Sequence, residues 1–450
     1  MNDRRNKELE LMDEQWNATE ARINAGIEYN RKGMGRICVK DATGTSLTDA
    51  KISVKQKSHA FRYGANIFML DELETDEKNA AYKEHMSKFG NMATLPFYWD
   101  ATEPQEGMTR YAKDSVPMYR RPPIDLCMEF CEKHGIEPRE HALAYEHFFP
   151  KWLYGADTFT VKRALERRYA QIAERYGDRI RTIEVTNEME WQNSRTDFYG
   201  DEDYIEFCFK LAEKYFPKNQ LVINEHTSMC WADRGICTDK YFAHIQSNLL
   251  KGARIDAIGM QFHLFNRREM EYEKTRSAYN PMSLYRHMDL YAKFGKPLQI
   301  TEVTVPAYSN NDEDEAFQAE AVEKLFSIWF SHPAVEQIIY WNMVDGYAHF
   351  WDPDPAKIRA SMGNMSLGEN YYYGGLLRFD MTPKPAYHAI RNLFEKKWHT
   401  EAILTTAQTG AACFNGFYGK YDVEIVADGK TVTYELDLRK GSKNVFEFTV

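Results

Sequence analysis

Two glutamates directly follow short apolar segments, at the positions where a buried strand would end. Glu188 follows RTIEVTN (181–187), and Glu302 follows LQIT (298–301). Two carboxyl groups that flank a glycosidic bond can hydrolyse it, because one protonates the leaving oxygen while the other attacks the anomeric carbon or activates water. A separation of about 5–5.5 Å retains the anomeric configuration, and about 6.5–9.5 Å inverts it. We interpret the two as a catalytic pair; the alternative is that each is a solvated residue at a strand end.

Further polar side chains end the neighbouring apolar segments and are candidates to bind a substrate. Asn187 precedes Glu188 and offers a neutral donor to a sugar hydroxyl. His263 ends the segment 256–263, next to the segment that carries Glu302, where an imidazole N–H would stabilise an ionised carboxylate. The other candidates are His141, Tyr145, Gln261, Trp341 and Tyr98.

Eight short apolar or β-branched segments alternate with longer helical patterns and would position these side chains. This alternation predicts an α/β fold, a (β/α)8 TIM barrel, whose active site lies at the carboxyl ends of the strands. An open doubly wound sheet is the competitor, but no glycine-rich phosphate-binding loop follows a strand. The predicted strands are 61–67, 92–99, 140–145, 181–188, 221–226, 256–263, 298–303 and 336–344.

The two ends of the chain have a different pattern. Residues 3–30 predict a surface helix, and the segments 35–44 and 50–58 predict a strand pair. A hairpin around Asp428-Gly429 and a last strand at 445–450 are expected near the other end. We expect these strands to form one small β-sandwich-like accessory domain into which the barrel is inserted. The predicted division is a helix at 1–30, β segments at 31–58 and 400–450, and the catalytic barrel at 59–399.

The composition of the chain disfavours several classes of function. The 450 residues carry a net charge of −10, which disfavours binding to nucleic acid, and no apolar run is long enough to cross a membrane. No signal peptide is visible, so the chain as written is expected to be intracellular, with secretion open if a leader was removed. Seven irregularly spaced cysteines do not indicate a disulfide framework, and Cys127 and Cys131 are expected in the core. We predict no cofactor and no metal, and a polysaccharide or oligosaccharide as the partner.

The order of motifs along some 340 residues resembles glycoside hydrolase family 10, the retaining endo-β-1,4-xylanases. The segment VTNEM (185–189) resembles the acid/base motif of that family, and ITEV (300–303) resembles its nucleophile motif. Each match alone is weak, but their shared order and their positions on the predicted strands are specific. The remaining matches are 61–64, 99–104, 141–152, 223–226, 255–264, 341–346 and 375–390.

The resemblance implies a role for each matched residue. Glu188 would be the general acid/base and Glu302 the nucleophile, and Asn187 would bind the sugar 2-hydroxyl. Gln261 and His263 would support the two carboxylates. The same subsite would be lined by His141 and Trp341.

Two departures from the family pattern concern the side of the cleft that binds the non-reducing sugars. Family members carry Glu-Asn-x-x-Lys-Trp on the second strand, but this chain has TLPFYW (94–99). The family's Trp-His on the third strand is replaced by Tyr145-Glu146. We expect this side of the cleft to be more apolar because of Pro96, Phe97 and Tyr98. The substrate specificity should therefore differ from that of an ordinary xylanase. Decorated xylan, a shorter oligosaccharide or another β-linked glycan remain open as substrates.

Two other functions remain as alternatives. A metal-dependent barrel enzyme, such as a sugar isomerase, could use carboxylate and imidazole ligands at the strand ends. A non-catalytic or weakly active glycan-binding barrel would account for the altered second and third strands. The retained glutamate pair argues against pure binding, which has little use for two carboxylates beside a neutral sugar. The ligands for the metal alternative would be Glu188, Glu225, His226, His263 and Glu302.

Overall fold

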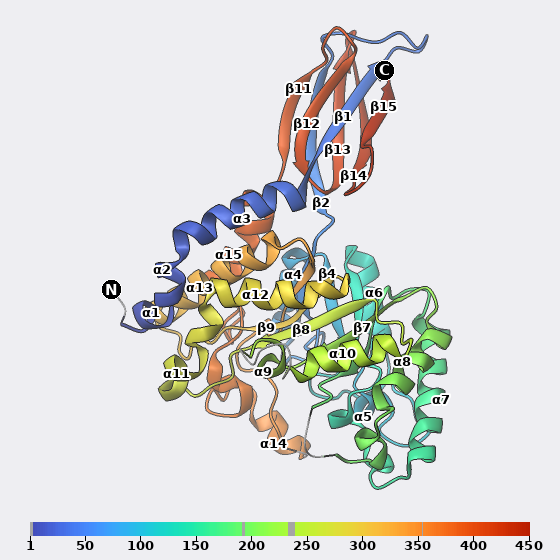
Figure 1. The fold of residues 1–450 in the computed structure, drawn as a ribbon, viewed down its shortest axis with the longest axis vertical. Helices are drawn as coiled ribbons and strands as arrows, with labels where there is room; N and C mark the ends of the chain where they lie inside the picture. Colours follow the sequence, from blue (N-terminus) through green and yellow to red (C-terminus); the bar gives the residue numbers. More distant parts are fainter. Residues whose placement is uncertain (1–2, 191–193, 233–238, 353) are drawn as a thin grey trace.

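A closed barrel of eight parallel strands forms the centre of the protein, as the computed structural model describes it for residues 3–190, 194–232, 239–352 and 354–450. The strands follow chain order around the ring, and the last closes on the first. The predicted (β/α)8 barrel is therefore confirmed (Figure 1). Its strands are β3 (Arg62–Asn66), β4 (Met92–Pro96), β5 (Glu137–His141), β6 (Thr182–Asn187), β7 (Gln220–Glu225), β8 (Ala257–His263), β9 (Leu298–Thr304) and β10 (Val335–Tyr340).

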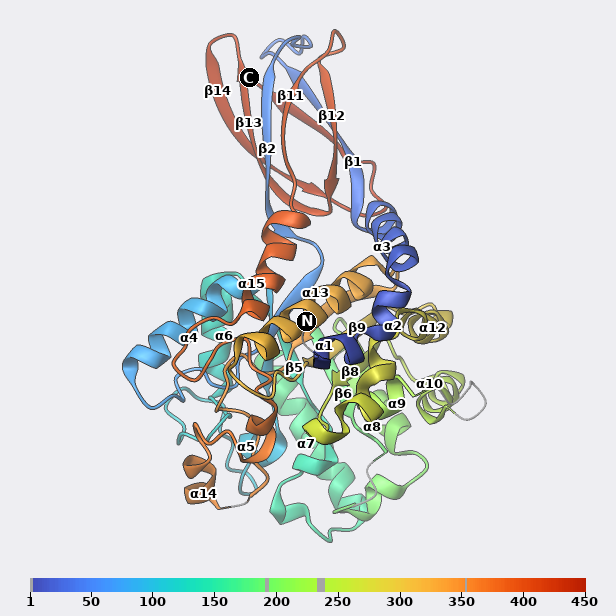
Figure 2. The ribbon, with the colours of Figure 1, turned by 90° about the vertical axis from the view of Figure 1, so that its left-hand side faces the viewer.

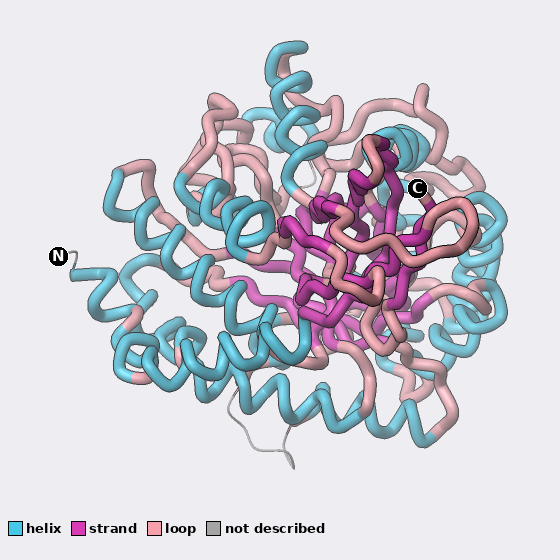
Figure 3. The backbone as a smooth tube through the Cα atoms, turned by 90° about the horizontal axis from the view of Figure 1, so that it is seen from above, coloured by secondary structure: helices cyan, strands magenta, loops and turns pink. Residues whose placement is uncertain are grey.

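Eight main helices surround the barrel (Figure 3). Strands β6 and β9 are buried along their whole length, because side chains on one face fill the barrel and those on the other contact helices. Several helices begin at a side chain that caps their first N–H groups, such as Asp157 before Thr158 and Asn280 before Pro281. The helices are α4 (Asp76–Phe89), α6 (Ile124–His134), α7 (Thr158–Tyr176), α8 (Tyr204–Tyr215), α10 (Lys240–Leu250), α12 (Pro281–Tyr291), α13 (Asp312–Ser331) and α15 (Pro385–Asn392).

The third barrel strand begins earlier than the sequence predicts. The apolar pattern placed it at 140–145, whereas β5 covers Glu137–His141. Three charged or titratable side chains in the strand itself, Arg139, Glu140 and His141, are fully buried and conceal the strand from a pattern based on apolar residues. The apolar residues that follow continue beside β6 through a few backbone hydrogen bonds, such as that from Leu143 N–H to the Glu184 carbonyl.

Strands from both ends of the chain form a β-sandwich, as the sequence predicts. One sheet contains β12 (Ala411–Phe417), β1 (Lys32–Lys40) and β15 (Val445–Thr449) in that order. The other contains β11 (Glu401–Thr405), β2 (Lys51–His59), β13 (Gly419–Ala427) and β14 (Lys430–Leu438). The hairpin at Asp428-Gly429 is confirmed, because β13 and β14 pair antiparallel across it.

The expected pairing of the two N-terminal strands is wrong. Strands β1 and β2 lie in different sheets, and only an isolated bridge between Lys40 and Ser46 links the turn between them. The reason is burial: Ile37 of β1 and Ile52 of β2 belong to one apolar cluster between the sheets. Strands β1 and β2 bury more apolar surface by facing each other across the core than they would by pairing in a flat hairpin.

The N-terminal segment forms three consecutive helices rather than one, α1 (Asp3–Glu8), α2 (Glu10–Glu14) and α3 (Trp16–Arg31). The interruption at Leu9 lets this fully buried side chain reach the core. Helix α3 packs along α13 (Figure 2), and a Cβ on Gly26 would lie 2.6 Å from the Ser331 carbonyl oxygen. Arg31 then donates to the carbonyls of His332 and Val335 at 2.6 Å each. These contacts attach the segment to the amino end of the barrel.

The sandwich is joined to the barrel through aromatic packing at the end where the barrel strands begin. Phe417 of β12 lies 5.8 Å from the His59 ring and 6.2 Å from Phe330 of α13. Phe417 belongs to the apolar core of the barrel. The sandwich therefore projects from the end opposite the short helices α5 (Trp99–Thr102) and α14 (Pro355–Ala360) (Figure 1).

The expectation that two cysteines of α6 lie in the core is confirmed. Cys127 and Cys131 of α6 are fully buried in the core. The described cysteines are all free thiols, and Cys237 lies outside the described residues. No helix in the described ranges combines the length and the apolarity needed to cross a bilayer.

Candidate active site

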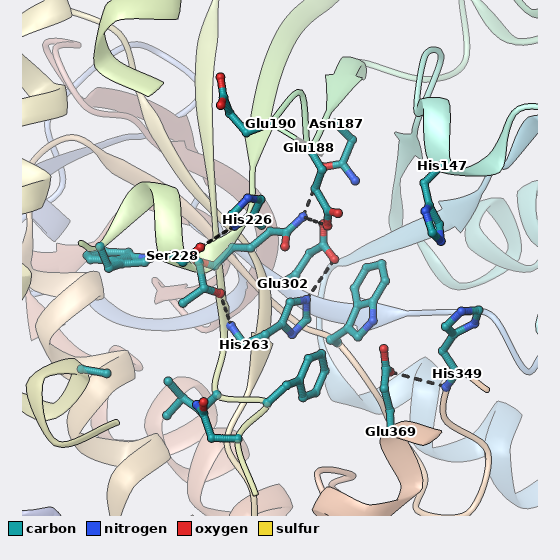
Figure 4. A pocket seen from close by; sticks show the side chains of 18 of the residues that line it. His147, Asn187, Glu188, Glu190, His226, Ser228, His263, Glu302, His349 and Glu369 are labelled. Carbon is teal, nitrogen blue, oxygen red and sulfur yellow. Dashed lines mark hydrogen bonds and ion pairs between the residues drawn. The ribbon is translucent and has the colours of Figure 1, made fainter. Parts of the chain in front are cut away.

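One cavity of about 980 Å³ opens at the carboxyl ends of the barrel strands. All nine residues that the sequence analysis proposes as catalytic or substrate-binding line this cavity. They come from six different barrel strands or the segments that directly follow them, so the closed barrel brings them together. Figure 4 shows Glu188 and Glu302 pointing toward one another near its centre.

A chain of amide hydrogen bonds connects the two glutamates. Gln261 Nε2 donates to Glu188 Oε1 at 2.8 Å and lies 3.2 Å from Asn187 Oδ1. Asn224 Nδ2 lies 2.9 Å from the same Asn187 oxygen and 3.1 Å from Glu302 Oε1. These contacts fix both carboxyl groups and leave the Asn187 amide nitrogen without a hydrogen-bond partner among the described residues. It is the atom that would donate to a sugar hydroxyl.

Glu302 is the more enclosed of the two carboxyl groups. It extends from β9 and is 3% exposed, and His263 Nε2 from the adjacent strand lies 3.2 Å from Oε2. The other ring nitrogen of His263 lies 3.0 Å from Thr304 Oγ1, which orients the imidazole. Burial raises the pKa of Glu302 to about 8 and lowers the pKa of His263 to about 4. At neutral pH the histidine is therefore uncharged and holds the carboxyl group by hydrogen bonding.

Glu188 stands in an unusual backbone conformation directly after β6. Its φ of 51° is in the left-handed region, which non-glycine residues rarely adopt and which functional sites often retain. Tyr145 Oη donates to Oε2 at 2.7 Å, and Tyr199 Oη donates to the Glu188 carbonyl at 3.0 Å. Contacts to both carboxylate oxygens give the side chain one defined direction into the cavity.

A buried charged cluster supports the floor of the site and was missed by sequence reasoning. Arg139 forms an ion pair with Glu184, and His141 Nδ1 lies 2.8 Å from the other Glu184 oxygen. Burial alone would raise the pKa of Glu184, but Arg139 and His141 outweigh it and lower this pKa. The other nitrogen of His141 lies 3.0 Å from Tyr98 Oη. A charged residue inside an otherwise apolar strand was the signal that could have identified Glu184.

The prediction of a more apolar wall near the second strand is wrong in one respect. Tyr98 lines the cavity, but Pro96 and Phe97 do not, because Phe97 is fully buried in the barrel core. Arg121 covers the Tyr98 ring, with its guanidinium carbon 3.8 Å from the ring centroid. Arg120 lines the cavity beside it. Both arginines lie in the irregular segment between α5 and α6, where neither strand nor helix periodicity marks them.

The ligand set of the metal alternative does not converge in the described residues. Glu225 is buried outside the cavity lining, and its two oxygens accept backbone N–H groups from Met189 and His226 at 2.8 and 2.9 Å. A different set, His141, Glu184 and Glu302, places its ligand atoms within 4.8 Å of one another. There the Arg139 cation already neutralises Glu184, which opposes a second cation.

Comparisons with known proteins agree with this architecture. The sequence pattern of glycosyl hydrolase family 10 matches residues 57–393. The chain is 25% identical over 430 residues to an anti-sigma-I factor, RsgI6, of Acetivibrio thermocellus, and 25% identical over 352 residues to endo-1,4-beta-xylanase B of Thermotoga neapolitana. These alignments cover 93% and 75% of this chain and 48% and 88% of those proteins. The crystal structure of xylanase 10B from Thermotoga maritima matches with a TM-score of 0.58 at 23% identity, over 75% of this chain and 96% of that one.

The fold and the strand-end site define a barrel of the glycosidase type, and the chain belongs to glycosyl hydrolase family 10. The chain spans about half or less of the length of the first curated relatives it matches, between 28% and 48% for four of them.

Proposed function

We propose that the protein hydrolyses β-1,4-linked xylan or a related β-glycan by double displacement, with retention of the anomeric configuration. The observation that carries this proposal is the placement of Glu188 and Glu302 in one cavity, in two different environments and linked through Asn187. Endo-1,4-beta-xylanases among the relatives support xylan as the substrate class.

In the first step Glu302 is the nucleophile. Its ionised carboxylate attacks the anomeric carbon and forms a glycosyl ester, while the glycosidic oxygen leaves with the proton of Glu188. His263 and Asn224 donate to the Glu302 carboxylate before the attack and orient it. Asn187 donates to the sugar hydroxyl next to the anomeric carbon.

In the second step Glu188 acts as a base. A water molecule loses a proton to Glu188 and attacks the anomeric carbon, and the Glu302 carboxylate leaves. The hydrogen bonds from Tyr145 and Gln261 direct Glu188 at one point of the cavity in both steps. Trp341 and His141, whose ring centroids are 5.3 Å apart, provide the wall against which the sugar ring packs.

Substitution of the two glutamates tests this assignment. Glu302→Ala and Glu188→Ala should each lose most activity on xylo-oligosaccharides, because each removes a reacting group. Azide should restore turnover of an activated aryl glycoside by Glu188→Ala and give the β-glycosyl azide. Glu166→Ala, on the exposed side of α7, is the matched control and should keep the parent rate.

The stereochemistry of the first-formed product separates retention from inversion. NMR at early reaction times should show the β-anomer. An α-anomer would overturn double displacement but not hydrolysis. Parent rates in both glutamate variants would overturn the site assignment.

A further inference from the structure

A buried guanidinium lines the cavity without a carboxylate partner. Arg121 is 7% exposed, and its Nη1 donates to the Arg120 carbonyl at 3.0 Å. Its other contacts are aromatic: the guanidinium carbon lies 3.8 Å from the Tyr98 centroid and 5.3 Å from that of Phe148. Among the described residues Arg121 forms no ion pair. Burial lowers its pKa, which shows the cost of keeping this cation out of water.

Arg120 strengthens the positive charge at the same wall. It is 4% exposed and donates to Asn342 Oδ1 at 3.0 Å, with its Nε atom buried and unpartnered. Glu369 is the acidic residue near it, and this carboxyl group is already held by Asn342 Nδ2 and the His349 backbone N–H at 3.4 Å each. Glu369 therefore offsets part of the Arg120 charge. Asp100 acts on Arg121 in the same sense, but it lies outside the cavity lining, and among the described residues it forms no ion pair with Arg121.

Two histidines complete the surface that we call the basic wall: Arg120, Arg121, His147 and His349. All four line the cavity, and Figure 4 shows His147 and His349 on the same side of it. The rings of both histidines contact Phe148, with centroids 4.9 and 5.8 Å from it. Burial lowers the pKa of His349, and the two arginines and His147 lower it further.

We propose that the basic wall binds the carboxylate of an acidic sugar, so that the natural substrate carries a uronic acid next to the bond that is cleaved. This inference rests on the proposed function and names the substrate class of the same site. Arginine presents a planar fork of N–H donors that matches a carboxylate with two parallel hydrogen bonds. A neutral xylose or glucose unit would leave the Arg121 charge desolvated and unpaired.

The position of the wall relative to the reacting groups determines which sugar is recognised. Tyr98 contacts Arg121 on its ring face, and its hydroxyl lies 3.0 Å from His141, which borders the Glu184 cluster. Phe148 also packs on Tyr145, whose hydroxyl reaches Glu188. One ring therefore separates the basic wall from the catalytic pair. A carboxylate on the sugar bound between the glutamates, or on its immediate neighbour, would reach Arg121.

Calorimetric binding of simple glycosides to the full-length protein tests this without any turnover. Methyl β-D-glucuronide should bind at least about tenfold more tightly than methyl β-D-glucoside, since a charge-assisted hydrogen bond contributes this much. Arg121→Gln should abolish the preference, and Arg121→Lys should restore part of it. Arg181→Gln, an exposed residue at the opposite end of the barrel, is the matched control. Thermal melting of each variant identifies a substitution that unfolds the protein.

Equal affinity for the two glycosides, or no measurable binding of the glucuronide, would overturn the proposal. A preference that survives Arg121→Gln in a folded variant would also overturn it. Tighter binding of methyl β-D-glucoside 6-sulfate than of the glucuronide would replace the carboxylate by a sulfate ester and so reject the uronic acid. Because these measurements involve no bond cleavage, their failure leaves the hydrolytic role of Glu188 and Glu302 standing.

Discussion

The Tyr145 hydroxyl donates a 2.7 Å hydrogen bond to Oε2 of Glu188. Tyr145 occupies the position where the family pattern has Trp, in the segment that follows β5, so this contact arises from one of the two departures from that pattern. Burial and the Glu188 charge both raise the pKa of Tyr145, so its hydroxyl stays protonated as a donor. The departure from the family pattern thus adds a direct contact to the residue that we assign as acid/base.

Tyr145→Phe should therefore reduce catalysis by misplacing Glu188. A hydrogen bond to a charged group contributes about 1.5–3 kcal/mol, so kcat/KM should fall about tenfold or more. The loss should be larger for substrates with poor leaving groups, which need protonation, than for activated aryl glycosides. Steady-state kinetics on a leaving-group series measures this. An equal loss of kcat/KM for all leaving groups would indicate that Tyr145 contributes to substrate binding instead.

The pH profile should reflect the enclosed position of Glu302. Burial raises the pKa of this carboxyl group to about 8, well above the ordinary value of about 4.3, and the nucleophile must be ionised. The acidic limb of kcat/KM, where Glu302 gains a proton, should therefore lie far above pH 5. The pKa of His263 is about 4, so its titration does not produce that limb.

His263→Ala is the variant that checks this assignment. It removes the contact at Oε2 and should move the acidic limb further toward alkaline pH, because the ionised form loses a donor. An acidic limb near pH 4 in the parent protein would contradict the prediction. An unchanged limb in His263→Ala would show that the histidine does not support the ionised nucleophile.

Arg139→Leu should destabilise the barrel strongly. Arg139 and Glu184 form an ion pair whose side chains are both 0% exposed, so the substitution leaves a buried carboxylate without its guanidinium partner. The expected loss is about 3–5 kcal/mol in the free energy of unfolding, measured by denaturant titration. Arg391→Leu breaks the half-exposed pair with Glu395 and should cost no more than about 0.5 kcal/mol. Similar losses in the two variants would argue against this cluster as a source of stability.

Activity should be insensitive to metal removal. The donor set His141, Glu184 and Glu302 is compact, but its charge is already balanced by Arg139. Dialysis against EDTA should leave kcat/KM unchanged, and added Mg²⁺, Mn²⁺ or Zn²⁺ should not increase it. A loss that a divalent cation reverses would favour the metal-dependent isomerase alternative over the glycosidase.

The barrel was predictable because its strands are buried on both faces. Segments such as 181–188 and 298–303 are short and rich in β-branched residues, and segments of this kind between helical patterns are typical of the strands of a parallel sheet. The two glutamates were predictable for the same reason, since a carboxylate directly after such a segment lies at a strand end. The predicted bounds of the third strand were too late in the chain. Arg139, Glu140 and His141 are buried polar residues, and a pattern based on apolar residues does not detect them.

The sequence by itself determined the barrel, the presence of strands at both ends and the residues that meet at the strand ends. These features depend on local periodicity, which burial imposes along the chain. Only the tertiary structure decided that β1 pairs in parallel with β15 rather than with β2, and that Arg120 and Arg121 enter the cavity. Partners some 400 residues apart, and side chains from a segment without regular structure, are chosen by packing in three dimensions and have no signature in neighbouring residues.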